Sequence, residues 1–176
     1  MARRTSLREF QEGLAARLAS ARRNETARAL LGVESGRTRW LMDLADSGEV
    51  IPLTALAPVP LTQPWFAGVA NVRGSLYSVV DFSAYQGFDP TPRNADARLL
   101  LVGARHGINS ALLVDRTLGL KNLGGMTAES VAGAGPAWIG ESYTDADGQR
   151  WTRLRITTLL EDPAFLDVGI GSSMGE

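Results

Sequence analysis

The sequence is informative first through what it lacks. Its 176 residues contain no cysteine, which excludes disulfide bonds, thiolate zinc sites and cysteine nucleophiles. His106 is the only histidine, and we interpret it as a solvated residue of a hairpin turn rather than as a general base. Clustered metal ligands and a glycine-rich phosphate-binding loop are also missing. The sequence therefore predicts neither a metal site nor a cofactor.

Long apolar runs are missing as well. The strongest apolar run, Leu99 to Val102, is far shorter than the roughly 20 residues that a membrane-spanning helix needs. The first residues lead into a polar segment without the apolar centre of a signal peptide. We therefore expect a cytoplasmic protein without direct membrane insertion.

Charge of either sign is not in large excess, because the formal net charge is −1. Residues 1–30 contain seven arginines and three glutamates, a surplus of four positive charges, which leaves a surplus of five negative charges in the rest of the chain. Neither value creates the field that nucleic-acid binding requires. A small barrel that binds nucleic acid is therefore the less favoured alternative.

An amphipathic helix is predicted near the start of the chain. Ser6 and Glu9 fit a capping box, in which each side chain satisfies a backbone donor of the other residue. Apolar residues then recur every three or four positions, so the helix is expected to reach about Arg23. We interpret residues 1–30 as a helical extension that either lies on the domain or docks onto a partner.

After Leu31 the sequence changes to short alternating segments separated by turns. The glycine-rich stretch Gly124–Pro136 is predicted to be a loop, and Thr158–Glu161 reads as a second capping box before a short helix that Pro163 interrupts. This pattern predicts an all-β barrel or sandwich. The predicted strands are Arg39–Ala45, Val50–Leu56, Gly68–Val72, Leu76–Phe82, Leu99–Ala104, Ile108–Asp115, Leu118–Leu123, Trp138–Tyr143 and Gln149–Ile156.

The central feature is a β-hairpin whose turn contains Arg73 and Gly74. Glycine suits a tight reversal because it has no Cβ, so Arg73 beside it is expected to reach solvent or a partner. Aliphatic, aromatic and arginine side chains near this turn have the composition of a protein interface. Alternatively, the valines and the tyrosine face the core while Arg73 makes a local contact. The side chains in question are Val69, Val72, Arg73, Tyr77 and Val79.

Two pairs of acidic residues, Asp145/Asp147 and Glu161/Asp162, lie close together in the sequence. Both pairs occupy predicted turns or helix ends, where carboxylates usually accept hydrogen bonds from the backbone. We therefore interpret them as structural and not as an acid–base pair. The sequence favours a binding module, and an enzyme site assembled from dispersed Asp, Glu and Arg residues is the alternative.

The hairpin resembles the signature of CheW-like chemotaxis coupling proteins. Gly68-Val-Ala-Asn-Val-Arg-Gly74 and Val79-Val-Asp-Phe82 match the family pattern G-V-x-N-x-R-G…P-V-x-D-L. Ser78 replaces the proline of this pattern, and Phe82 replaces the leucine. Two further segments, Pro52–Pro60 and Leu112–Asp115, resemble the family as a whole. Two others, Pro64-Trp65 and Asp162–Val168, resemble the branch of the family from type IV pilus twitching-motility systems.

The resemblance covers about residues 31–169, with residues 170–176 as a tail. It implies an all-β, CheW-like fold of two five-stranded SH3-like β-barrels that share a core, flanked by an N-terminal helix and a short C-terminal helix. It also implies an adaptor without catalysis or cofactors. Such an adaptor binds the cytoplasmic tip of a methyl-accepting chemoreceptor and a CheA-type histidine kinase, and it joins membrane chemoreceptor arrays through these partners.

The resemblance also implies where partners bind. Asn71, Arg73 and Gly74 stand at signature positions, and the receptor helix is expected in an apolar groove between the barrels near them. Arg73 either pairs with a receptor carboxylate or holds the groove. A flagellar or other chemosensory system is the alternative to a pilus system. The candidate protein-binding residues are Val69, Asn71, Val72, Arg73, Gly74 and Tyr77.

Overall fold

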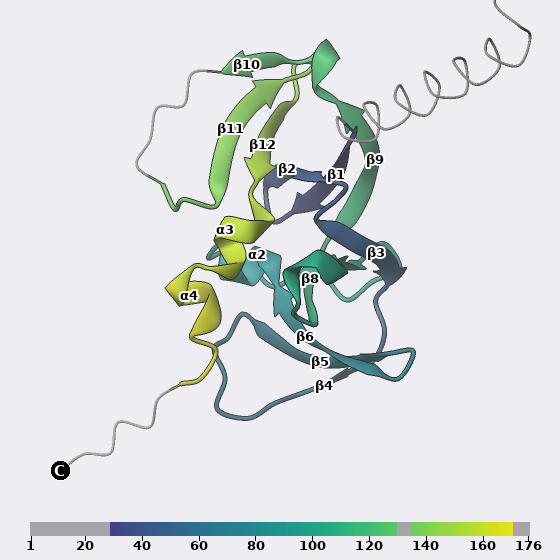
Figure 1. Cartoon of the computed structure of the whole chain (residues 1–176), viewed down its shortest axis with the longest axis vertical. Helices are drawn as coiled ribbons and strands as arrows, with labels where there is room; N and C mark the ends of the chain where they lie inside the picture. The colour runs from purple at the N-terminus through teal and green to yellow at the C-terminus, as the bar shows by residue number, and fades with distance from the viewer. Residues whose placement is uncertain (1–28, 130–134, 171–176) are drawn as a thin grey trace, which may run out of the picture.

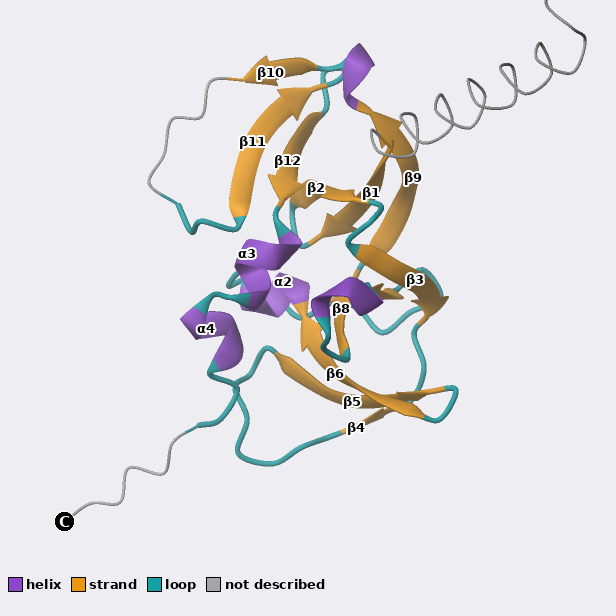
Figure 2. Ribbon diagram, viewed as in Figure 1, coloured by secondary structure: helices purple, strands orange, loops and turns teal. Residues whose placement is uncertain are grey.

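The computed structural model describes residues 29–129 and 135–170. These residues form two mixed β-sheets, one above the other in Figure 1, with short helices at the junction between them. Figure 2 shows the same arrangement by element type. The helix predicted to end near Arg23 lies outside the described residues.

The first sheet has the strand order β10-β11-β12-β2-β1-β9. Its neighbouring strands run antiparallel except for β12 and β2, which are parallel. The strands are β1 (Ala29–Ser35), β2 (Thr38–Asp43), β9 (Arg116–Asn122), β10 (Thr127–Glu129), β11 (Ile139–Thr144) and β12 (Arg150–Leu154).

The second sheet has the strand order β3-β7-β8-β6-β5-β4. Only β6 and β8 run parallel among its neighbouring strands. The strands are β3 (Ser47–Pro52), β4 (Leu56–Ala57), β5 (Phe66–Val72), β6 (Ser75–Asp81), β7 (Arg98–Val102) and β8 (Ser110–Val114). The short helices are α2 (Phe82–Tyr85), η1 (Ala104–His106), η2 (Leu123–Gly125), α3 (Ile156–Leu160) and α4 (Pro163–Leu166).

Chain connectivity shows that each sheet curls into a barrel. Strands β3 and β4 occupy opposite edges of the second sheet, which would lie about 24 Å apart if the sheet were flat. The chain from Pro52 to Leu56 spans at most about 14 Å, so the edges must approach each other. The same holds for β9 and β10, since the chain from Asn122 to Thr127 spans at most about 18 Å.

The largest apolar cluster lies between the two barrels and confirms the predicted shared core. Trp40 and Val33 reach it from the first barrel, and Phe82, Leu100 and Leu112 reach it from the second. Each barrel also has a smaller interior cluster of its own. In each sheet one edge strand is very short, two residues in β4 and three in β10, so five main strands remain per barrel.

The central strands of the second barrel are buried on both faces, which explains their continuous apolar sequences. In β7, Leu99 faces the interior of the barrel and Leu100 faces the cluster between the barrels. Strand β8 alternates in the same way, with Leu113 inside and Leu112 outside. The strands predicted at Leu99–Ala104 and Ile108–Asp115 are thereby confirmed to within a few residues.

Several local predictions were wrong. Thr158 does not cap a helix, because α3 already begins at Ile156, whose side chain is buried in the shared core. The interruption of the helix at Pro163 is confirmed: α3 ends at Leu160 and Pro163 begins the separate helix α4, which Asp162 caps by accepting a hydrogen bond from the backbone N–H of Ala164 at 2.9 Å. The predicted Gly124–Pro136 loop contains β10, which pairs with β11.

Two predicted strands are also shorter than expected. The segment Val50–Leu56 divides into β3 and β4, since no ladder continues between Pro52 and Leu56. Phe82 does not extend β6 but begins α2, which Asp81 caps through the backbone N–H of Ala84. Packing of Phe82 into the shared core thus ends the strand one residue early.

Candidate protein-binding surface

The β5–β6 hairpin ends in a two-residue turn formed by Arg73 and Gly74. Both residues have positive φ angles, 52° and 88°, which is typical of a type I′ hairpin turn. The side chain of Asn71 accepts a hydrogen bond from the backbone N–H of Gly74 at 2.8 Å. Asn71 and Gly74 therefore fix the shape of the turn that presents Arg73.

Arg73 forms a two-pronged ion pair with Glu49 of β3. Its two terminal nitrogens donate to the two Glu49 carboxylate oxygens at 2.7 and 2.6 Å. This hydrogen bonding raises the pKa of Arg73. The Arg73 side chain is 76% exposed, and solvent screens an exposed pair of this kind, so it contributes little to folding. The pair links the hairpin tip to β3, at one edge of the sheet.

The six candidate side chains do not share one surface. Val72 and Tyr77 pack against the interior cluster of the second barrel, and Val79 is buried within it. Successive side chains in a strand alternate between faces, so Val69 and Asn71 point to the outside of the barrel. Of the two interpretations of the valines and the tyrosine, the one in which Val72, Tyr77 and Val79 face the core is confirmed, and Arg73 pairs locally.

Sequence reasoning missed an exposed apolar strip on the outside of the second barrel. Leu76 projects from β6 with 62% of its area exposed, and Ile108 and Leu166 are also exposed. Because β6 and β8 run parallel with Ser78 opposite Ser110, Ile108, two residues before β8, lies near Leu76. We call Val69, Asn71, Leu76, Ser78, Ile108 and Leu166 the outer hairpin surface. Strand alternation in the sequence predicts this face of β6, but not that it is left uncovered.

A shallow apolar cavity of about 170 Å³ adjoins this surface, between β6, the start of β8 and α4. Ser78, Ile108 and Leu166 line it together with buried Phe165. It forms a depression beside the outer hairpin surface.

The signature aspartate, Asp81, is buried and has a structural role. Its carboxylate accepts hydrogen bonds from the Thr91 hydroxyl at 2.7 Å and the Thr91 backbone N–H at 2.9 Å. It also accepts a weaker hydrogen bond from the N–H of Ala84 at 3.3 Å. Asp81 therefore ties the segment after α2 to the end of the central hairpin.

The single histidine is not a solvated turn residue, so that interpretation was wrong. The His106 side chain is only 8% exposed, and its Nε2 lies 2.9 Å from a carboxylate oxygen of Asp46. Arg105 also pairs with Asp46. Asp46 follows β2 and His106 lies in η1, so this contact joins two turns that are far apart in sequence.

One member of each acidic pair, Asp145 and Asp162, accepts hydrogen bonds from the backbone, as the sequence suggested. Asp145 accepts hydrogen bonds from the Trp151 indole N–H at 2.8 Å and from the backbone of the β11–β12 turn. These hydrogen bonds lower the pKa of Asp145, and the bond from the Trp151 indole has the largest effect. In residues 29–129 and 135–170, no group of three or more His, Cys, Asp or Glu side chains is arranged to hold a metal ion.

Comparison with known proteins agrees with this architecture. The profile of the CheW-like domain matches residues 29–164, which is most of the chain. The chain belongs to the CheW-like domain family. The family resemblance noted at the hairpin is thus confirmed. The matched region contains both barrels and the first half of α4.

Two individual proteins are similar to this CheW-like chain. Protein PilI of Pseudomonas aeruginosa is 27% identical over 92 residues, which cover 52% of this chain and 51% of PilI. The alignment thus spans about half the length of that relative. The crystal structure of the scaffolding protein TtCheW from Thermoanaerobacter tengcongensis matches with a TM-score of 0.63 and 17% identity. It covers 78% of this chain and 95% of TtCheW, which confirms the predicted CheW fold.

The described part of this CheW-like chain contains only short helices. None of them has the length and apolar character that a membrane-spanning helix requires.

Proposed function

We propose that this protein is a non-catalytic adaptor that couples a methyl-accepting chemoreceptor to a CheA-type histidine kinase. The observation that carries the proposal is the CheW-like domain match over residues 29–164. The adaptor works by contact, without a cofactor, in the cytoplasm beside membrane receptor arrays. The coupling domain begins with β1 at Ala29, two residues before the boundary expected from the sequence, and reaches residue 169, with residues 1–28 as an extension and residues 170–176 as a tail.

The similarity to PilI favours a system that controls type IV pilus twitching motility. The pilus-like segments Pro64-Trp65 and Asp162–Val168 lie close together in the fold, since Trp65 and Phe165 stack with their ring centroids 6.2 Å apart. A flagellar or other chemosensory system is the second candidate, because the CheW-like domain is common to the whole family.

The hairpin offers two different binding surfaces for two partners. At its tip, Asn71, Gly74 and the Arg73–Glu49 pair present charge, which suits the polar edge of a receptor helix. On its outside, the outer hairpin surface presents exposed Leu76 and Ile108, which suit an apolar face of the kinase. Val69 belongs to this second surface, whereas Val72 and Tyr77 support both surfaces from the barrel interior.

A matched pair of leucine substitutions tests the assignment. Leu76→Glu places a charge on the outer hairpin surface, and Leu120→Glu places one on β9 of the other barrel, where Leu120 is 64% exposed. Both positions are open to solvent, so both variants are expected to fold. We expect Leu76→Glu to weaken binding of the kinase regulatory domain by at least about tenfold, the scale of an interface hot spot. Equal binding by wild type and both variants in calorimetry would contradict the assignment.

A second pair tests the tip. Arg73→Ala removes the arginine of the turn, and Arg116→Ala removes an exposed arginine of the other barrel, one terminal nitrogen of which donates to both carboxylate oxygens of Glu34. We expect only Arg73→Ala to weaken binding of a receptor-tip fragment. If receptor binding is unchanged while the melting temperature is normal, the tip is not the receptor contact.

A further inference from the structure

A cationic cleft lies away from the hairpin, at the β1–β2 turn of the first barrel. It has a volume of about 570 Å³ and is lined by the β1–β2 turn and by the start of β12. Three arginines, Arg37, Arg39 and Arg150, line it together with a single carboxylate, Glu34. The volume falls in the range of small-molecule sites, which is about 300–1,000 Å³.

The local turn places Arg37 at the mouth of this cleft. Ser35 pairs with Thr38, so Gly36 and Arg37 form a two-residue turn, and Gly36 has a φ of 62°. A glycine with positive φ at the first turn position is typical of a type II′ hairpin. The Asp115 carboxylate accepts a hydrogen bond from the backbone of Gly36, which holds the turn in place.

The arginines of the cleft are only partly neutralised. Glu34 is shared between Arg39 at 3.6 Å and Arg116 at 3.0 Å. Arg150 pairs with Glu129 at 3.0 Å. Arg37 forms no ion pair with any residue in the described ranges. The lining of the cleft therefore carries three arginines and one glutamate, while Glu129 pairs with Arg150 and Asp115 lies beside the turn that carries Arg37.

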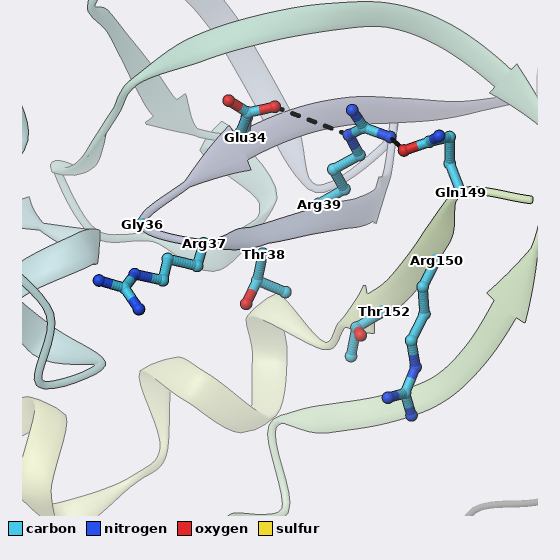
Figure 3. A pocket seen from close by; sticks show the side chains of 8 residues that line it. All are labelled: Glu34, Gly36, Arg37, Thr38, Arg39, Gln149, Arg150 and Thr152. Carbon is cyan, nitrogen blue, oxygen red and sulfur yellow. Dashed lines mark hydrogen bonds and ion pairs between the residues drawn. The ribbon is translucent and has the colours of Figure 1, made fainter.

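Two hydroxyl groups lie between the outer arginines of the cleft. In Figure 3, the side chains of Thr38 and Thr152 stand between those of Arg37 and Arg150. The threonines come from neighbouring strands, because β2 and β12 pair in parallel with Thr152 opposite Trp40. Neither hydroxyl donates a hydrogen bond to another residue within 29–129 and 135–170. Both donors are therefore available to a ligand.

Arginine and threonine side chains together suit a phosphate group. Arginine binds phosphate through two parallel N–H groups, and a hydroxyl adds a further donor. Because no ion pair holds Arg37, its guanidinium group can turn toward the threonines at little cost. We propose that this cleft binds a phosphate-bearing ligand, with a phosphate on the Thr38 and Thr152 hydroxyls between Arg37 and Arg150.

The neighbouring surface leaves room for the rest of such a ligand. A second cavity of about 500 Å³ shares Gly36 and Arg37 with the cleft and is lined by Phe88, Pro90 and Asp89. The Phe88 side chain is exposed there. An aromatic ring beside a phosphate site fits a nucleotide, and an open groove fits a phosphorylated peptide; both supply the same phosphate chemistry.

Calorimetric titration of the full chain with sodium pyrophosphate at low ionic strength tests the site itself. We expect saturable binding that weakens at least tenfold in Arg37→Gln and in Arg150→Gln. Arg155→Gln is the matched control, since Arg155 is exposed, follows β12 and pairs with one carboxylate, Glu141, at 2.7 Å. This control should bind pyrophosphate as wild type does.

Two further probes distinguish the source of the phosphate. Tighter binding of ADP than of a phosphoserine peptide assigns the cleft to a nucleotide, and the reverse order assigns it to a phosphorylated partner. In NMR spectra of the complex, the backbone amides of Thr38 and Thr152 should shift. No saturable binding of pyrophosphate, or an equal loss in Arg155→Gln, would overturn the proposal.

Discussion

The hydrogen bonds of Asp81 allow a quantitative test of how the signature aspartate holds the fold. Asp81→Ala leaves the buried Thr91 N–H and hydroxyl, and the N–H of Ala84, without their acceptor. Each buried donor left unsatisfied costs about 1–3 kcal/mol. The Ala84 contact is long, so two strong bonds dominate. Part of the cost is offset because the carboxylate no longer has to be buried.

We therefore expect Asp81→Ala to lower the free energy of unfolding by about 3 kcal/mol. That is a large share of the ~5–15 kcal/mol that stabilises a typical domain. Urea denaturation followed by tryptophan fluorescence measures the change, provided that the slope of the transition stays the same. The conservative variant Thr91→Val keeps the shape of the side chain and removes only the hydrogen bond of its hydroxyl. It should lower the free energy of unfolding by about 1–2 kcal/mol.

The double variant sharpens the test, because Asp81 and Thr91 share a bond. Its total loss should be smaller than the sum of the two single losses, as expected for residues in one network. A loss below about 1 kcal/mol in Asp81→Ala, or strict additivity in the double variant, would refute the assigned role.

Three further predictions follow from the described contacts. Arg73→Ala should leave the midpoint of urea denaturation close to that of the wild type, because the pair of Arg73 with Glu49 is exposed; a clear drop in the midpoint would show a structural role for the pair. Deletion of residues 1–28 should leave the circular dichroism spectrum of the β fold intact, since β1 begins at Ala29; unfolding would place the extension in the core. Burial, and then the charge of Asp162, raise the pKa of Tyr85 to about 12 from 10.0. The folded state keeps this proton while the unfolded state loses it, so stability should fall between pH 10 and 12, and Tyr85→Phe should reduce that fall in pH-dependent melting.

Much of the fold was predictable because its central strands are buried on both faces. The runs at β7 and β8 are continuously apolar, and no other element fits such runs between turns. The hairpin was predictable because Gly74 marks the turn and β6 alternates. Local sequence decides these elements, and tertiary contacts only reinforce them.

Other features depend on contacts between distant segments. His106 is buried because Asp46, sixty positions earlier, lies beside it. Helix α3 begins at Ile156 because that side chain fills the shared core, although a capping pattern suggests a later start. Strand β10 forms because β11 pairs with it, despite its glycine-rich surroundings.

The candidate site was predictable in position but not in composition. The sequence located the turn with Asn71, Arg73 and Gly74, and the structure keeps these residues at an exposed tip. The sequence did not decide which face of each strand meets solvent, so Val72 and Tyr77 were predicted as binding residues together with Val69. Leu76 was passed over, because an apolar residue in a strand is more often covered than exposed.

The central claim is that this chain holds a receptor and a kinase at the same time. Sedimentation of a receptor-tip fragment mixed with the regulatory domain of the kinase tests it most directly. We expect the two to sediment together only when this protein is added, and to separate again when Leu76→Glu replaces the wild type. Co-sedimentation without the protein, or two separate species in its presence, would contradict the claim.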